Sequence, residues 1–226
     1  MKFLSLINNK GQLIAFSGID CAGKSTQIDL LIEYIRDSGA KPVYLWTRGG
    51  YTGPFNVLKS LVRLIMGKKT LPSGRNEKRD LVIKKPWVRN MWLTLAIVDL
   101  IFVYGVYVRF LRWSGKVIIA DRYLWDTWID FRLNFVEVNV DRWFIWKILT
   151  WLTPKPDHAF LLLIPTEESI RRSKQKDEPF PDSEETLKKR LECYKELSLK
   201  VDWTVLDCMM PVEEIADEIT EKTQNR

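Results

Sequence analysis

One nine-residue stretch near the N-terminus, GIDCAGKST, constrains the fold more than any other part of the chain. It reads G-x-x-x-x-G-K-S-T and covers residues 18–26, called the P-loop below. Glycines at both ends let backbone N–H groups turn toward one anion, and a helix starting there presents its positive end to that anion. The lysine adds a point charge, and the serine hydroxyl is a ligand for Mg²⁺. The pattern therefore predicts a loop that holds a chain of phosphates.

The segments on either side of the P-loop are the ones that the motif requires. An apolar run over residues 13–17 predicts a strand before it, and Ile28, Leu31, Ile32 and Ile35 recur at helical spacing after it. Strand, glycine-rich loop and helix in this order indicate binding of a nucleoside triphosphate. The predicted nucleotide-binding residues are Gly18, Ile19, Asp20, Cys21, Ala22, Gly23, Lys24, Ser25 and Thr26.

The composition is ordinary for a soluble globular protein. The chain has 226 residues, of which 46% are hydrophobic and 28% charged, which is enough for a sizeable core. We therefore expect a single domain over residues 1–226. Three scattered cysteines without metal-ligand spacing and no secretory signal favour a reducing compartment, and we expect the cytoplasm. A single histidine argues against Ser-His-Asp chemistry.

A second apolar strand, predicted over residues 116–120, ends in Asp121, Arg122 and Tyr123. A carboxylate at the tip of a hydrophobic strand is the arrangement that organises Mg²⁺ and its waters beside a P-loop. An arginine next to it can neutralise a transferred phosphate. We predict Ser25 and Asp121 as metal ligands.

Three further strands are predicted over residues 42–46, 158–164 and 204–207, and helical segments alternate with them. This alternation predicts an α/β fold, with three layers (α/β/α) and a central five-stranded parallel sheet. Ligands bind at the carboxyl ends of strands in such sheets. Arg48, just after residues 42–46, is therefore a candidate phosphate or acceptor contact, with a solvated loop arginine as the alternative.

Two stretches have more than one interpretation. Residues 67–89 are polar and basic, and we favour a solvated loop over a nucleic-acid patch. Residues 91–110 are apolar enough to be tested as a membrane span. Asp99 lies near the centre of that run, where a carboxylate would cost about 2.5–3.5 kcal/mol in a membrane. We therefore expect a buried central helix, partly at a dimer interface, with peripheral membrane contact as the alternative.

The segment over residues 124–153 is rich in aromatic residues, for which we favour core packing over base stacking by a residue such as Trp128. Asp126 and Asp130 are four apart and would share one helix face. We expect both carboxylates to be solvated unless that face lines the cleft.

A charged helix is predicted from Pro165 onward, with Thr166 as its cap, and it runs into a basic segment. Residues 171–183 have the composition of a short mobile lid, whose cations could reach over bound phosphates. Arg171 and Lys174 are the lid cations that we predict as catalytic. The alternative is a solvated helix end.

Taken together, this series of motifs resembles the thymidylate kinase family of nucleoside monophosphate kinases. Family members typically read F-x-G-x-D-G-x-G-K-S-T-Q at the P-loop, and this chain reads FSGIDCAGKSTQ over residues 16–27. The resemblance covers nearly the whole chain and is weakest over residues 52–90 and 124–150. It implies a P-loop kinase with a short helical lid that transfers the γ-phosphate of ATP, with Mg²⁺, to dTMP or a related nucleotide. It also implies a homodimer, and we expect no specific nucleic-acid partner and no membrane contact.

The resemblance also assigns roles to individual residues. Asp20 would reach the sugar of the acceptor nucleotide, and Arg48 and Arg122 would hold its phosphate. The predicted catalytic residues are Lys24, Asp20, Arg122, Arg171 and Lys174. The predicted acceptor-binding residues are Asp20, Arg48, Asp99, Arg122 and Tyr123.

The chain departs from the family in the segments that would read the base. The family's Glu-Pro after Arg48 is missing, and Asp99 is followed by leucine where the family commonly has an arginine. Leu124 to Trp128 replace small and polar residues. Two alternatives follow: the same fold acting on a different small-molecule acceptor, or a nucleotide-binding interaction protein without catalysis.

Overall fold

The computed structural model describes residues 11–47, 85–177 and 182–224, which form parts of two compact units. The first unit comprises Met1–Trp46, Arg109–Asn139 and Lys155–Arg226, and the second comprises Thr47–Val108 and Val140–Pro154. A single domain over residues 1–226 stays a prediction. Residues 54–66, whose apolar residues recur at helical spacing, and most of the basic stretch over residues 67–89 lie outside the described residues.

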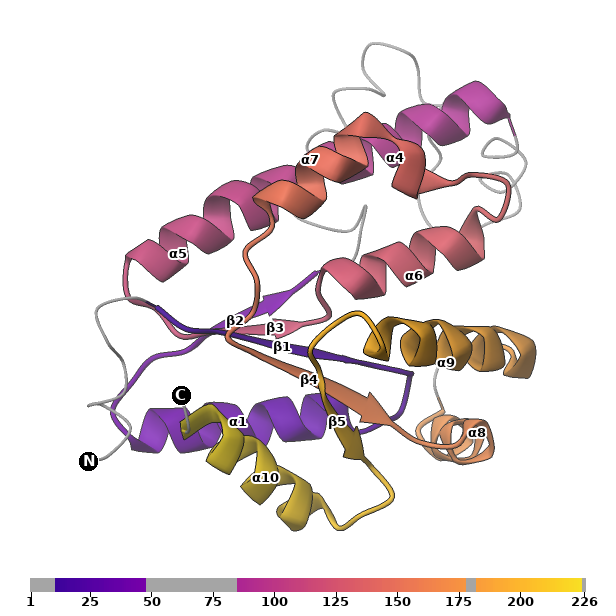
Figure 1. The fold of residues 1–226 in the computed structure, drawn as a ribbon. Coiled ribbons are helices and arrows are strands. Elements are labelled where there is room, and N and C mark those ends of the chain that lie inside the picture. The colour runs from indigo at the N-terminus through magenta and orange to yellow at the C-terminus, as the bar shows by residue number, and fades with distance from the viewer. Residues whose placement is uncertain (1–10, 48–84, 178–181, 225–226) are drawn as a thin grey trace. The chain divides into compact units, whose positions relative to one another are not determined.

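The first unit is built around a five-stranded sheet in the order β2-β3-β1-β4-β5 (Figure 1). All four pairs of neighbouring strands are parallel. The five predicted strands are confirmed to within two residues at each end. Their bounds are Leu13–Gly18 for β1, Val43–Trp46 for β2, Ile118–Asp121 for β3, His158–Leu163 for β4 and Thr204–Asp207 for β5.

Every residue of β1 is buried, because this central strand has a neighbour on each side and helices cover both faces of the sheet. Figure 1 shows α1 and α10 below the sheet and α6 and α9 above it. These helices span Lys24–Asp37, Val212–Gln224, Leu124–Asn134 and Glu184–Ser198, in that order. The first unit also contains α5 (Arg109–Trp113) and α8 (Thr166–Gln175). The predicted three-layer α/β/α architecture is confirmed.

The described part of the second unit is helical. It contains α4 (Pro86–Leu100), the π-helix η1 (Ile101–Val108), the short 3₁₀-helix η2 (Val140–Arg142) and α7 (Phe144–Leu152), and α7 packs against the other three. Gly105 brings η1 and α7 close together, since a Cβ atom there would lie 3.3 Å from the Cβ of Leu152. A larger residue at this position would push the two helices apart.

The continuous helical stretch Pro86–Trp113 is long and apolar enough to cross a membrane, and half of its most apolar window is buried. A core helix of a soluble protein has the same properties. The predicted burial is confirmed for one side of the stretch, where Tyr104 is fully buried. On the other side Phe102 is 64% exposed, and the dimer interface expected for part of this stretch stays a prediction.

The aromatic side chains in the segment after β3 also differ in burial. Trp128 and Trp146 are buried, as expected for core packing, whereas Phe144 and Trp151 on α7 are exposed.

Candidate active site

The P-loop connects β1 to α1 and has the backbone of an anion cradle. Gly18 and Gly23 have φ values of 144° and 90°, which favour glycine. A Cβ atom on Gly18 would lie 2.2 Å from the carbonyl oxygen of Leu162, because β4 passes directly beside the loop. Gly23 is the N-cap of α1, and no side chain caps this helix end. The first N–H groups of α1 are therefore available to an anion.

Lys24 is the first residue of α1 and is buried. Its Nζ donates hydrogen bonds to the carbonyl oxygens of Gly18 at 3.0 Å and Ile19 at 2.6 Å. Burial, together with the positive charge of Arg122, lowers the pKa of Lys24 to about 8. These two bonds engage two of the three N–H donors of the ammonium group, so a phosphate that takes more than one of them competes with the carbonyls.

The lowered pKa of Lys24 predicts a pH dependence. A lysine with a pKa of about 8 is charged below that pH and loses its proton above it, and a neutral amine cannot pair with phosphate. We expect kcat/KM for ATP to fall by roughly tenfold per pH unit above pH 8, because this parameter follows the protonation of the free enzyme. Initial rates at low ATP and saturating acceptor between pH 7 and 9.5 measure it. A flat profile over this range would contradict the assignment.

Asp20 and Arg122 form an ion pair beside the P-loop. The guanidinium Nη2 of Arg122 donates to Oδ1 of Asp20 at 2.5 Å. Burial raises the pKa of Asp20, but the charges of Arg122, Lys24 and Arg190 outweigh it, so that the pKa lies below its ordinary value. Asp20 is therefore an ionised carboxylate among cations. Arg122 also has a positive φ of 70°, a conformation that is uncommon outside glycine and is often found at functional sites.

The two predicted metal ligands lie at the carboxyl edge of the sheet. Asp121 ends β3 and is buried, and the hydroxyl of Tyr44 on β2 donates to its Oδ2 at 2.9 Å. Ser25 is exposed in the first turn of α1. A hydroxyl and a carboxylate are oxygen donors that suit Mg²⁺, which usually takes few protein ligands beside water and phosphate oxygens. Within the described residues, no group of three or more His, Cys, Asp or Glu side chains could hold a metal ion by itself.

The predicted lid cations have different surroundings. Arg171 is exposed and forms an ion pair with Glu168 at 2.7 Å. Lys174 lines a cavity of about 470 Å³ together with residues of α8 and α9, and Asp20 of the P-loop lines the same cavity. The structure thus brings Lys174, and not Arg171, to a cavity that contains a P-loop side chain.

The remaining predicted residues are placed as follows. Tyr123 is the N-cap of α6, where its side chain and Asp126 form a capping box. Asp99 is buried in α4 of the second unit. Arg48 lies outside the described residues. Thr166 is the first residue of α8, which has Pro165 as its N-cap, so the predicted cap was wrong.

The expected solvation of Asp126 and Asp130 was wrong, because both carboxylates are buried. Asp126 accepts hydrogen bonds from Ser17 and Tyr194, and Asp130 forms an ion pair with Arg190 at 2.7 Å. The face of α6 that carries them is covered by α9. The sequence contained a signal for this contact. Arg190 and Tyr194 are four residues apart, as Asp126 and Asp130 are, so each pair can lie on one face of its helix.

The sequence is similar to those of known thymidylate kinases. The family model described as Thymidylate kinase matches residues 103–219 of the chain. A thymidylate kinase of Plasmodium falciparum is 24% identical over 218 residues, which cover 94% of this chain and 90% of that protein. A thymidylate kinase of Desulfotalea psychrophila is 30% identical over 169 residues, which cover 73% of this chain and 69% of that protein.

Proposed function

The chain belongs to the thymidylate kinase family, and we propose that it transfers the γ-phosphate of ATP to dTMP or a closely related nucleoside monophosphate. The class of enzyme, an ATP-dependent nucleoside monophosphate kinase, follows from the family. One observation carries the proposal for this chain. Lys24 at the P-loop and the ion pair of Asp20 with Arg122 lie in one unit, within electrostatic range of each other.

Phosphate transfer of this kind needs positioning and charge neutralisation more than covalent chemistry. In the proposed reaction, Lys24 leaves the two P-loop carbonyls and pairs with the phosphates of ATP. Arg122 pairs with the phosphate of the acceptor, and Asp20 orients Arg122 and the sugar of the acceptor. Lys174 contributes a further positive charge from the cavity beside Asp20.

The proposal includes Mg²⁺. Ser25 and Asp121 would hold the ion, Asp121 directly or through its waters, with Tyr44 fixing the orientation of that carboxylate. When bound, Mg²⁺ would neutralise negative charge on the phosphates. The oxygen donors at the two positions fit such an ion.

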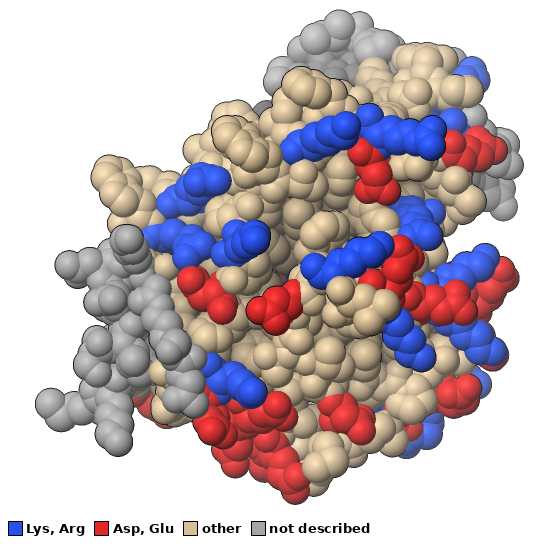
Figure 2. All heavy atoms as spheres, in the orientation of Figure 1, with Lys and Arg blue, Asp and Glu red and all other residues tan. Residues whose placement is uncertain are grey.

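We also propose a cytoplasmic homodimer without a specific nucleic-acid or membrane partner. Apolar side chains exposed on η1, among them Phe102 and Val106, support an interface with a second copy. On the face drawn in Figure 2, Lys and Arg side chains and Asp and Glu side chains are both present, the acidic ones most numerous at the lower left. A nucleic-acid groove would instead gather positive charge on one surface, so this mixed pattern supports the proposal for that face.

The test is an acceptor panel. ADP release from MgATP is measured with dTMP, dUMP, UMP, CMP, dGMP and AMP, each against ATP alone. We expect dTMP or another pyrimidine monophosphate to accelerate ADP release by at least about tenfold. This factor is a modest part of the rate enhancement that correct positioning of an acceptor supplies. If none of the six accelerates ADP release, the proposed reaction is wrong.

A further inference from the structure

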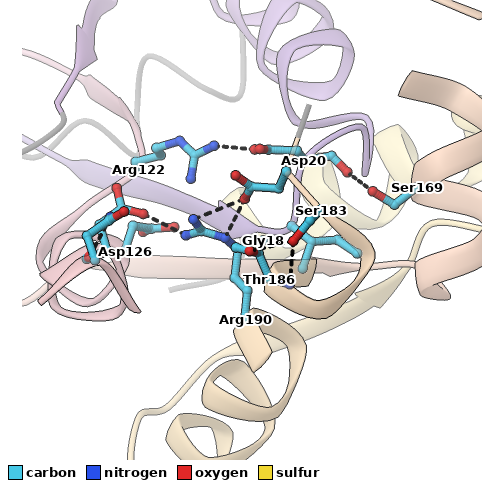
Figure 3. A network of polar contacts seen from close by, with 12 residues as sticks. Gly18, Asp20, Arg122, Asp126, Ser169, Ser183, Thr186 and Arg190 are labelled. Carbon is cyan, nitrogen blue, oxygen red and sulfur yellow. Dashed lines mark hydrogen bonds and ion pairs between the residues drawn. The ribbon is translucent and has the colours of Figure 1, made fainter. Parts of the chain in front are cut away.

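The hydroxyl of Tyr194 lies where the P-loop meets two helices of the first unit. Tyr194 comes from α9 and is fully buried. Its hydroxyl lies 2.6 Å from Oδ1 of Asp126 on α6 and 3.2 Å from the carbonyl oxygen of Gly18 in the P-loop. Figure 3 shows Gly18 and Asp126 within this network, together with Asp20, Arg122 and Arg190. No role was assigned to this tyrosine from the sequence.

Asp126 holds the hydroxyl in place. Its carboxylate is almost fully buried and accepts three hydrogen bonds, from Ser17 Oγ at 2.6 Å, from the backbone N–H of Tyr123 at 2.9 Å and from the hydroxyl of Tyr194. A buried carboxylate needs such donors, because without them its burial is costly. The same carboxylate thus connects the end of β1, the residue that follows Arg122, and α9.

The carbonyl oxygen of Gly18 accepts from Nζ of Lys24 at 3.0 Å and lies 3.2 Å from the hydroxyl of Tyr194, whose single proton is shared between this oxygen and Oδ1 of Asp126. If Lys24 turns to the phosphates of ATP, it leaves this oxygen, and the hydroxyl of Tyr194 is the side-chain donor that stays. The peptide group that carries this oxygen also carries the N–H of Ile19, which points in the opposite direction because the peptide is planar and trans. A donor on the oxygen therefore also fixes the direction of an N–H group of the P-loop.

We propose that Tyr194 is a positioning residue for ATP binding: its hydroxyl holds the Gly18 carbonyl when Lys24 leaves that carbonyl for the phosphates. The inference rests on the proposed ATP-dependent function. Burial and the nearby Asp126 raise the pKa of Tyr194 well above its ordinary value, so the hydroxyl keeps its proton at any working pH. The ring of Tyr194 packs edge-on against Trp203, with centroids 6.1 Å apart, and this contact does not involve the hydroxyl.

Tyr194→Phe tests the proposal, because it removes the hydroxyl and keeps the ring. We expect the dissociation constant of a non-hydrolysable MgATP analogue, measured by calorimetry, to rise about tenfold, since the bound state would leave a buried acceptor without its donor. KM for ATP should rise by a similar factor, while KM for the acceptor stays within about twofold. Tyr34→Phe is the matched control: its hydroxyl accepts a hydrogen bond from Gln224 near the other end of α1. This control should leave both constants unchanged.

Ser17→Ala provides a second variant if Tyr194→Phe does not fold. Without the donor from Ser17, Asp126 draws the single proton of Tyr194 more strongly and away from Gly18, so ATP should again bind more weakly. In the double variant the effect should not exceed that of Tyr194→Phe, because Ser17 acts through the same hydroxyl.

The outcomes separate this inference from the proposed function. If the unmodified protein binds the analogue and Tyr194→Phe binds it equally well, the positioning role is wrong and the kinase function stands. A variant that melts at a lower temperature but keeps the same ATP dissociation constant would show a purely structural role and would also overturn the inference. If the unmodified protein does not bind the analogue, the proposed function fails, and the inference fails with it.

Discussion

Lys24→Met is expected to lower kcat for phosphate transfer by about a thousandfold, the scale on which single positive charges act in phosphoryl transfer. The ammonium group lies inside the P-loop, where burial makes its charge unfavourable and lowers its pKa to about 8. A buried ammonium group of this kind becomes electrostatically favourable when an anionic phosphate binds beside it. Methionine fills a similar volume without charge, so the fold should be retained. ADP release at saturating ATP and acceptor measures the loss.

Lys188→Met is the matched control for this prediction. Lys188 is exposed on α9, where it pairs with Glu184 one turn earlier. An exposed ion pair of this kind contributes little to the stability of the fold. The kcat of this variant should therefore stay within about twofold of its normal value. A loss of less than about tenfold in Lys24→Met, measured on protein with a normal melting temperature, would contradict the role of Lys24.

Arg122→Met is expected to lower kcat/KM for the acceptor by about a hundredfold to a thousandfold, as the loss of one well-placed phosphate partner does. Arg122 is the buried cation closest to Asp20, and its guanidinium group would pair with the acceptor phosphate. The dissociation constant of the ATP analogue should change by no more than about threefold, because Lys24 and the N-terminus of α1 remain. Initial rates at varied acceptor and fixed ATP measure the first quantity, and calorimetry the second.

Another arginine–aspartate pair of the same unit serves as the control. Arg112 on α5 forms an ion pair with Asp157 at 3.0 Å in the same unit, and neither residue has a proposed role in the reaction. Arg112→Met removes the same type of pair, so any general effect of losing an ion pair on stability or solubility should appear there too. Equal losses of acceptor kcat/KM in the two variants would mean that Arg122 acts through the fold and not through the acceptor.

Much of the fold could be predicted because its signals are local. The strands are short apolar runs, two of which end in an aspartate, and the P-loop contains its own glycines, lysine and serine in one segment. The order of strands and helices along the chain then leaves few arrangements other than a parallel sheet with helices on both faces. For the same reason, the sequence alone places Asp121 at the tip of β3.

The polar contacts behind the P-loop could not be predicted, because each depends on a partner far away in the sequence. Whether Asp126 is solvated or buried depends on α9, which brings Tyr194 against it from a position 68 residues later. The pairing of Asp130 with Arg190 has the same origin. Likewise, the basic run of α8 contains several similar cations, and only the packing of α8 beside α9 places Lys174, and not Arg171, at the cavity.

The sequence by itself determined the family, the sheet and the loop that binds phosphate, since hydrophobic periodicity and a contiguous motif act over a few residues. Only the tertiary structure decided which carboxylates are buried, which cations face Asp20, and that the hydroxyl of Tyr194 reaches the carbonyl of Gly18. The physical reason is burial: a polar side chain is stable inside a protein only beside a matching partner, and folding, not the order of residues, brings that partner to it.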